Sequence, residues 1–320
     1  MMMEKQDKKS VSLAAWMAQV RGPFLILAIL LVAIGLAFAY KMTGPAEKEF
    51  NLWHALMLLT GVVSAHISVN LFNEYSDHKT RIDSHTKRTP FSGGSGMMQQ
   101  GLTTPRQVLT VAVTTLLLAF SIGVYFTFTS HWFIMVLTLI GGVTIISYTE
   151  GLARIQLGEL FAGLALGSLV VIGTYVAMTA TPGMPLSGII PLKVILVSVP
   201  PGILTALLLL INEFPDMEAD KAGGRRHLVI VLGRKKAAYL YAFGMFLTFG
   251  TILILPLVGL ASAWIYLALI PMPLGIRSSI TAIRHGDDIP KMVPALGTNV
   301  ITVLGTDLLL AVGIIIPPGF

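Results

Sequence analysis

Long apolar stretches separated by short polar segments make up most of this chain. Within each stretch the apolar residues run continuously instead of alternating, which favours membrane-spanning helices over the strands of a barrel. Nine stretches are long enough to cross a bilayer. They cover approximately residues 24–42, 53–73, 107–129, 132–148, 158–180, 189–212, 237–257, 260–282 and 293–316. Because backbone groups in lipid must be hydrogen-bonded internally, the predicted fold class is an all-α polytopic membrane protein with nine transmembrane helices.

The composition supports the same fold class. Hydrophobic residues make up 54% of the 320-residue chain and charged residues only 12%, whereas soluble domains carry about 25% charged residues. The chain has no cysteine, which excludes disulfides and thiolate metal sites. No Pro-, Ser- or Gly-rich linker divides the chain, so we expect one membrane domain over residues 1–320.

The distribution of Lys and Arg predicts the orientation of the chain. With nine crossings, all 22 Lys and Arg residues except Lys41, Lys48 and Lys193 fall on one side. By the positive-inside rule this side is cytoplasmic, so residues 1–22 and the N-terminus are cytoplasmic and the C-terminus is outside. The first apolar stretch is too long for a signal-peptide core, so we expect no cleavage and predict an integral protein of the cell membrane.

Two short polar segments at the ends of apolar spans share one pattern. Asn73 and Asp77 form an Asn-x-x-x-Asp motif at the end of the second span, and Asn212 and Asp216 repeat it at the end of the sixth. Both motifs fall on the predicted cytoplasmic side. Carboxylates this close to lipid are costly unless something positive binds them. The pattern favours a binding site for a divalent cation with a diphosphate over solvated helix ends of ordinary mixed charge.

The second motif has the spacing of a helical stripe. Asn212, Asp216 and Asp220 are four residues apart, so all three lie along one helix face. Two carboxylates and an amide oxygen are suitable ligands for Mg²⁺, which also takes substrate phosphates and waters. We expect Pro215 to loosen the helix here and free backbone carbonyls.

The first motif is stretched, because Asp83 follows Asp77 by six residues. Asp83 joins the site only if the helix ends near Lys79. Nearby basic residues are candidates for diphosphate binding alongside Asn73 and Asn212. They are Lys79, Arg88, Lys221, Arg225 and Arg226.

Three further residues are candidates, and two of them have two readings each. Tyr148 ends the fourth span on the same side, where its ring face could stabilise a developing cation or belong to an interfacial tyrosine belt. Arg21 could reach a ligand or anchor the first helix. Arg154 lies in a loop, residues 150–154, where an acceptor could bind.

Taken together, the paired motifs resemble those of the UbiA superfamily of intramembrane prenyltransferases, over nearly the whole chain. The resemblance implies helices around a central cavity, capped by two Asp-rich cytoplasmic loops. It also implies Mg²⁺-dependent transfer of a polyprenyl group from its diphosphate to an acceptor, usually an aromatic ring. Four aspartates would then hold two Mg²⁺ ions: Asp77, Asp83, Asp216 and Asp220. The implied partners are polyprenyl diphosphate, a small aromatic acceptor and membrane lipid, with no nucleic acid.

Within that superfamily, the six-residue step from Asp77 to Asp83 resembles the 1,4-dihydroxy-2-naphthoate polyprenyltransferases of menaquinone biosynthesis. Segments around Tyr148-Thr149, residues 157–160, residues 173–175 and residues 220–226 are similar to the same branch. The alternatives are prenylation of 4-hydroxybenzoate, homogentisate or a glycerol-phosphate lipid. A polyprenyl-phosphate lipid transporter is the alternative outside enzymes. It would need access from both membrane faces, whereas the ionisable residues crowd one side.

Overall fold

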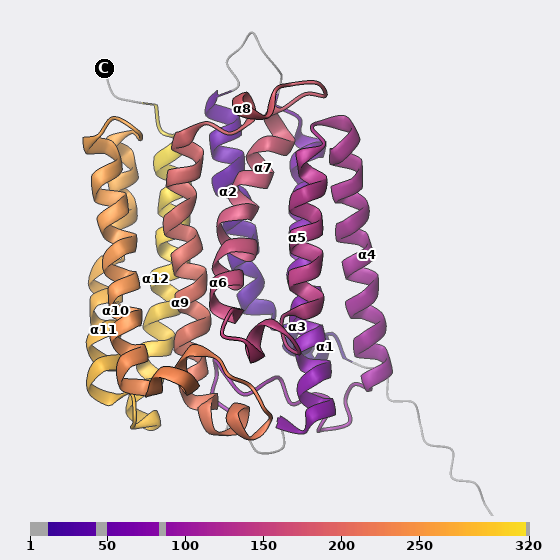
Figure 1. The fold of residues 1–320 in the computed structure, drawn as a ribbon, viewed down its shortest axis with the longest axis vertical. Coiled ribbons are helices and arrows are strands. Elements are labelled where there is room, and N and C mark those ends of the chain that lie inside the picture. The colour runs from indigo at the N-terminus through magenta and orange to yellow at the C-terminus, as the bar shows by residue number, and fades with distance from the viewer. Residues whose placement is uncertain (1–11, 43–49, 83–87, 318–320) are drawn as a thin grey trace, which may run out of the picture.

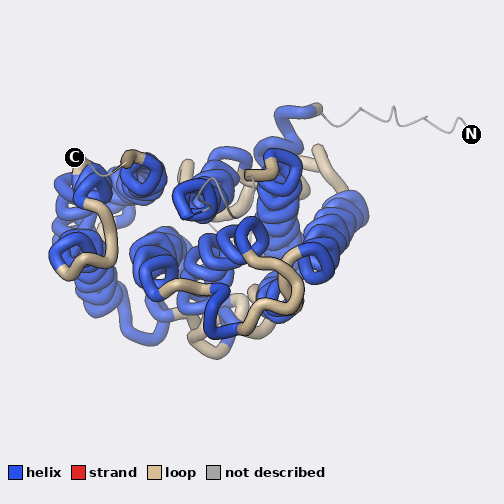
Figure 2. The backbone as a smooth tube through the Cα atoms, turned by 90° about the horizontal axis from the view of Figure 1, so that it is seen from above, coloured by secondary structure: helices blue, strands red, loops and turns tan. Residues whose placement is uncertain are grey.

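The computed structural model describes residues 12–42, 50–82 and 88–317, and this part of the chain contains helices and no strand (Figures 1 and 2). Eight of its helical segments are long and apolar enough to cross a membrane, and α5 is a shorter apolar helix between them. These nine segments are η1–α2 (Gly22–Phe24, Leu25–Met42), α3 (Leu52–Thr80), α4 (Pro105–Thr129), α5 (Phe133–Ser147), α6–η4–α7 (Gly158–Gly163, Leu164–Ser168, Leu169–Thr179), α9 (Leu192–Ala222), α10 (Leu228–Leu257), η5–α11 (Ala263–Leu269, Met272–His285) and α12 (Ile289–Ile315). Each matches one predicted stretch, so the all-α membrane fold is confirmed.

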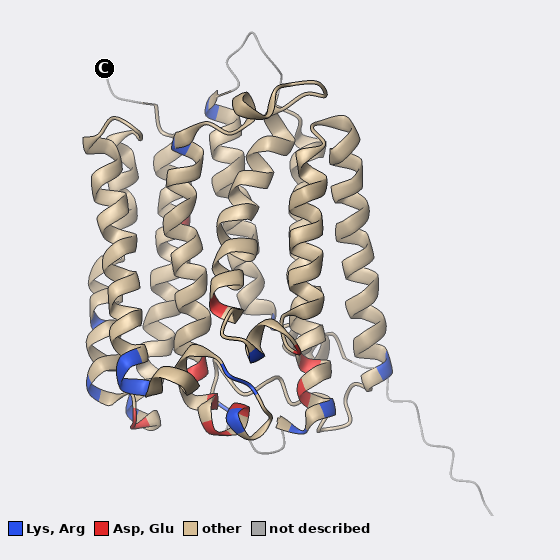
Figure 3. Cartoon of the chain, in the orientation of Figure 1, with Lys and Arg blue, Asp and Glu red and all other residues tan. Residues whose placement is uncertain are grey.

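The long helices run side by side, and helices from both ends of the chain are neighbours. Contacts link α2 to α12, α3 to α4, and α9 to α10 (Figure 1). The short helices α1 (Leu13–Gln19) and α8 (Leu186–Ile189) lie at opposite ends of the bundle. Acidic and basic residues gather at the end where α1 lies, and few occur at the other end (Figure 3). The charge asymmetry read from the sequence is therefore a property of the fold.

The fifth predicted span is interrupted by a turn of π-helix, η4, between α6 and α7. At this interruption the backbone approaches α9 closely. A Cβ added to Gly163 would lie 2.6 Å from the Gly202 carbonyl oxygen, and one added to Gly167 would lie 2.6 Å from the Gly202 Cα. Only glycine fits such a contact, which holds α6 against the half of α9 that leads to the second polar motif.

Near the polar end, α9 continues through Pro215 without interruption, so the predicted loosening of the helix is not observed. The neighbouring Phe214 carbonyl accepts a hydrogen bond of 3.2 Å from Arg234 Nε. Arg234 follows a break in α10 at Gly233, whose φ of 77° and ψ of 154° are accessible only to glycine. The break lets the first turn of α10 fold over the end of the bundle.

Candidate active site

A cavity of about 360 Å³ lies between the helices and has a polar end and an apolar body. Both sequence motifs lie at the polar end, where Asn73 and Asp77 of α3 face Asn212, Asp216 and Asp220 of α9 across the cavity. α3 ends at Thr80, which meets the condition set above that this helix should end near Lys79. Helical residues about 139 positions apart in sequence are thus brought to one site, as the shared pattern indicated.

Arg225 connects the two motifs directly. Its guanidinium forms an ion pair with Asp77, another of 2.7 Å with Asp220, and a hydrogen bond of 3.2 Å to the Asn73 Oδ1. Burial by itself lowers the pKa of Arg225, but the carboxylates of Asp77 and Asp220 outweigh it and raise this pKa above the usual value. The guanidinium therefore stays charged and holds α3 and α9 together at the site.

Arg21 brings a second positive charge to the cavity from the start of the first span. Its backbone is left-handed, with a φ of 54°, which is uncommon for a residue other than glycine. Burial lowers its pKa, but Glu74, Asp77 and Asp216 raise it above the usual value. The side chain is 3.3 Å from the Glu74 Oε1. A strained backbone that aims a charged side chain into a cavity is typical of a functional position.

Glu74 has a structural role that its place beside Asn73 does not reveal. Its carboxylate accepts hydrogen bonds from Gln19 Nε2 at 2.9 Å, Ser95 N at 2.8 Å and Ser95 Oγ at 2.6 Å, besides the pair with Arg21. It thereby joins α1, α3 and the loop around residues 92–96. In the same loop, the Gly93 N–H donates to Asp216 Oδ2 at 3.1 Å. The loop is thus fixed to both motifs.

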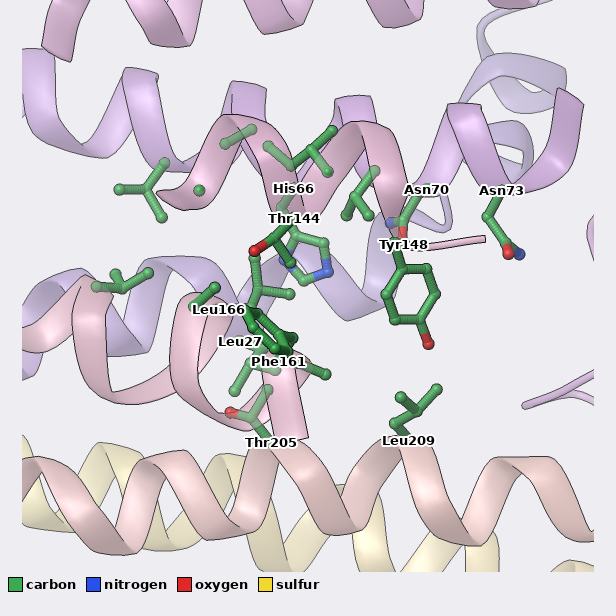
Figure 4. A pocket seen from close by; sticks show the side chains of 18 of the residues that line it. Leu27, His66, Asn70, Asn73, Thr144, Tyr148, Phe161, Leu166, Thr205 and Leu209 are labelled. Carbon is green, nitrogen blue, oxygen red and sulfur yellow. The ribbon is translucent and has the colours of Figure 1, made fainter. Parts of the chain in front are cut away.

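Tyr148 follows α5 and points into the cavity between the polar end and the apolar body (Figure 4). Beyond it the cavity is lined by apolar side chains as far as Phe126 and Ile134, with His66 and Thr144 among them. Such a shape suits a long apolar chain with a charged head.

The polar end has the ligand chemistry that Mg²⁺ requires. Asn212 Oδ1 and Asp216 Oδ1 are buried and have no hydrogen-bond partner within the described residues. They lie with Asp77 and Asp220 around one end of the cavity, and every candidate ligand atom is oxygen. A hard divalent cation binds through one or two carboxylates of this kind, together with substrate phosphates. These residues therefore fit Mg²⁺.

Other predicted site residues do not line the cavity. Lys79, Lys221 and Arg226 are exposed, and Arg226 contributes its backbone N–H to the Ala153 carbonyl at 3.0 Å. Arg154 is paired with Glu150 at 2.6 Å on the surface. The guanidinium of Arg88 lies against Gly96, on the outer side of the 92–96 loop. Asp83 lies outside the described residues.

Sequence reasoning missed two residues that line the polar end. They are Glu213, which follows Asn212 in the second motif, and His227. His227 is 3.4 Å from Glu213 and 3.2 Å from Asp220. No periodic pattern connects His227 to the motifs, because it belongs to the turn between α9 and α10. Its place eleven residues after Asp216 in a charged loop was the available signal.

Residues 42–293 match the sequence model of the UbiA prenyltransferase family. The chain is 29% identical over 265 residues to a 1,4-dihydroxy-2-naphthoate octaprenyltransferase of Bacillus subtilis, covering 82% of this chain and 81% of that protein. Its fold is similar to the apo structure of a UbiA homolog from Aeropyrum pernix K1, with a TM-score of 0.63, 15% identity, and coverage of 91% and 97%. It is also similar to a UbiA homolog from Archaeoglobus fulgidus bound to GPP and Mg²⁺, with a TM-score of 0.55, 13% identity, and coverage of 92% and 99%.

Proposed function

The chain belongs to the UbiA prenyltransferase family and is an integral membrane prenyltransferase, and we propose that its acceptor is 1,4-dihydroxy-2-naphthoate. The observation that carries the proposal is the junction of two Asn-x-x-x-Asp motifs at the polar end of an apolar cavity. The name of the Bacillus subtilis relative supports the acceptor. We propose that the polar end faces the cytoplasm, because nearly all Lys and Arg residues lie on that side.

In this proposal the diphosphate of the prenyl donor binds at the polar end. Arg225 is a partly buried cation at that end, and a guanidinium suits two-pronged contact with phosphate oxygens. The amides of Asn73 and Asn212 orient the same head group. Asp77, Asp216 and Asp220, with Asp83, would hold two divalent cations. Bound Mg²⁺ supplies Lewis-acid stabilisation of the charge that develops on the leaving diphosphate.

The apolar body of the cavity holds the isoprenoid tail and excludes water. Ionisation of the carbon–oxygen bond to diphosphate gives an allylic cation, which water would otherwise trap. Tyr148 lies between the polar end and the apolar body, so its ring face is available to that cation.

The acceptor ring forms the new carbon–carbon bond. In the naphthoate, attack occurs at the ring carbon that bears the carboxylate, and that group leaves as carbon dioxide while the ring regains aromaticity. We assign Arg21 to the acceptor carboxylate, since its partly exposed side chain lines the cavity and carries a fixed charge. Arg154 is paired with Glu150 on the surface, so we assign it no direct contact with the acceptor.

An assay with purified protein tests the proposal. The reaction contains Mg²⁺, a labelled polyprenyl diphosphate and one acceptor from a panel: 1,4-dihydroxy-2-naphthoate, 4-hydroxybenzoate, homogentisate or a glycerol-phosphate lipid. We expect a prenylated product and labelled carbon dioxide from carboxyl-labelled naphthoate, and neither after chelation of Mg²⁺. Preference for any other member of the panel would refute the acceptor assignment while leaving prenyl transfer in place.

A further inference from the structure

Three buried side chains that can bind a metal meet beside the diphosphate site. Glu159 begins α6, Glu213 lies on α9 and His227 precedes α10, and each is at least nine-tenths buried. One ligand atom from each residue lies within 4.8 Å of the other two. The cluster thus joins three segments that are far apart in the sequence.

Several atoms of this cluster lack partners within the described residues. Glu159 Oε1 accepts a hydrogen bond of 2.7 Å from the Leu228 N–H, but Glu159 Oε2 and Glu213 Oε2 accept none. The ring nitrogens of His227 contact only carboxylate oxygens, at 3.4 Å from Glu213 and 3.2 Å from Asp220. Glu74 is a contrasting case, because a guanidinium and three other donors satisfy its buried carboxylate. Buried carboxylates without a donor or a cation are costly.

No Lys or Arg in the described structure pairs with Glu159 or Glu213. Arg225, which lines the same end of the cavity, pairs with Asp77 and Asp220 and donates to Asn73. The unpartnered atoms face one another instead, with His227 Nδ1 at 3.4 Å from Glu213 Oε2. Ligand atoms bound at about 2.1 Å to a tetrahedral metal are separated by about 3.4 Å, so this spacing is that of a coordination sphere.

We propose that Glu159, Glu213 and His227 bind one divalent transition-metal ion of the Zn²⁺ type, separate from the Mg²⁺ of the diphosphate site. A set of one imidazole and two carboxylates suits Zn²⁺ and its neighbours, whereas Mg²⁺ takes oxygen ligands. Water or a substrate oxygen from the cavity completes the coordination, since Glu213 and His227 both line it. The site goes beyond prenyl transfer and does not depend on the acceptor.

The second ring nitrogen of His227 gives the metal a link to the reaction site. With the metal on Nδ1, the proton resides on Nε2, which is 3.2 Å from Asp220 Oδ2. A metal-bound histidine that donates to a carboxylate fixes the orientation of both groups. Asp220 also receives Arg225 at 2.7 Å. His227 is therefore a positioning residue, through which the metal holds Asp220 and Arg225 in place.

Metal analysis of the full-length protein in detergent tests this site without an activity assay. The protein is stripped with a chelator, dialysed against micromolar Zn²⁺ with millimolar Mg²⁺ to saturate the oxygen-only site, and analysed by mass spectrometry. We expect one bound Zn²⁺ per chain in the wild type, in Asp77→Asn and in Glu218→Gln, an exposed carboxylate on the same helix as Glu213. We expect its loss in Glu159→Gln and His227→Gln.

A variant that could lose metal simply by misfolding calls for a second test, in which metal binding produces a new spectroscopic band. Because the chain has no cysteine, His227→Cys introduces its sole thiolate. With Co²⁺ bound, this variant should show a sulfur-to-cobalt charge-transfer band, and Arg226→Cys, at the exposed neighbouring position, should not. Absence of Zn²⁺ from the wild type would overturn the proposal in favour of two carboxyls that share a proton. Zn²⁺ lost from Asp77→Asn but kept by His227→Gln would also overturn it.

Discussion

Replacement of Glu74 by glutamine tests whether this carboxylate stabilises the fold or binds a metal ion. The side chain lies next to the Asn73 motif, yet its oxygens are occupied by Gln19, Arg21 and Ser95. Glutamine keeps the shape, but it removes the charge and turns one acceptor oxygen into a donor. At least two of the groups that donate to Glu74 in the wild type would then face either the new NH2 group or an uncharged amide oxygen.

The size of the effect follows from those contacts. A hydrogen bond to a charged group contributes about 1.5–3 kcal/mol, so the loss of two lowers the free energy of unfolding by about 3–6 kcal/mol. Breaking a buried ion pair by removing one partner costs a similar amount, about 3–5 kcal/mol. Glu74→Asp keeps the charge and should lose less, since the shorter side chain weakens the contacts without opposing them.

Chemical unfolding in mixed micelles measures the stability, and the Mg²⁺ dependence of prenyl transfer measures metal affinity. We expect Glu74→Gln to be strongly destabilised with an unchanged Mg²⁺ concentration for half-maximal rate. The matched control is Glu218→Gln, a surface carboxylate whose side chain is 72% exposed, which should behave as wild type in both assays. The reasoning fails if Glu74→Gln unfolds like the wild type but requires at least tenfold more Mg²⁺, about 1.4 kcal/mol of metal binding.

Three further changes probe the site and the membrane interior. Asp77→Ala or Asp216→Ala should abolish turnover while circular dichroism in detergent still reports a helical fold; near-normal activity in either contradicts the metal assignment. Arg225→Lys should raise KM for polyprenyl diphosphate by about 10- to 100-fold, because an ammonium cannot replace the guanidinium fork between Asp77 and Asp220; an unchanged KM counts against its role. Asp307→Val should raise the free energy of unfolding by about 1–3 kcal/mol, since this fully buried carboxyl has no hydrogen-bond partner within the described residues; Asp307→Asn, which stays polar, should not.

The sequence predicts those parts of the site that depend on a single helix. The four-residue step of Asn212, Asp216 and Asp220 is enough to put them on one face, and the polar run after Asp77 is enough to end α3 near Lys79. Hydropathy locates the spans for the same reason, because each helix in lipid satisfies its own backbone. These features need no knowledge of which helices are neighbours.

Contacts between different segments cannot be predicted from the pattern of a single helix. Arg225 and Arg226 are adjacent and equally basic, but in the turn after α9 one side chain points to Asp77 and Asp220 and the other to the surface. Because they are adjacent in the sequence, both were equally good candidates for diphosphate binding. The roles of Glu74 and His227 are not predictable from the sequence for the same reason, since their partners come from other parts of the chain.

The equal depth of the two motifs follows from helix length. A helix needs about 20 residues to cross the hydrocarbon core. Asn73 and Asn212 each come about 20 residues after Leu52 and Leu192, the first residues of α3 and α9. Both helices then extend further, to Thr80 and Ala222, so their carboxylates emerge just beyond the apolar region and face each other at one level. Two helices of ordinary span length would end before either aspartate, and Arg225 would have no pair of carboxylates to join.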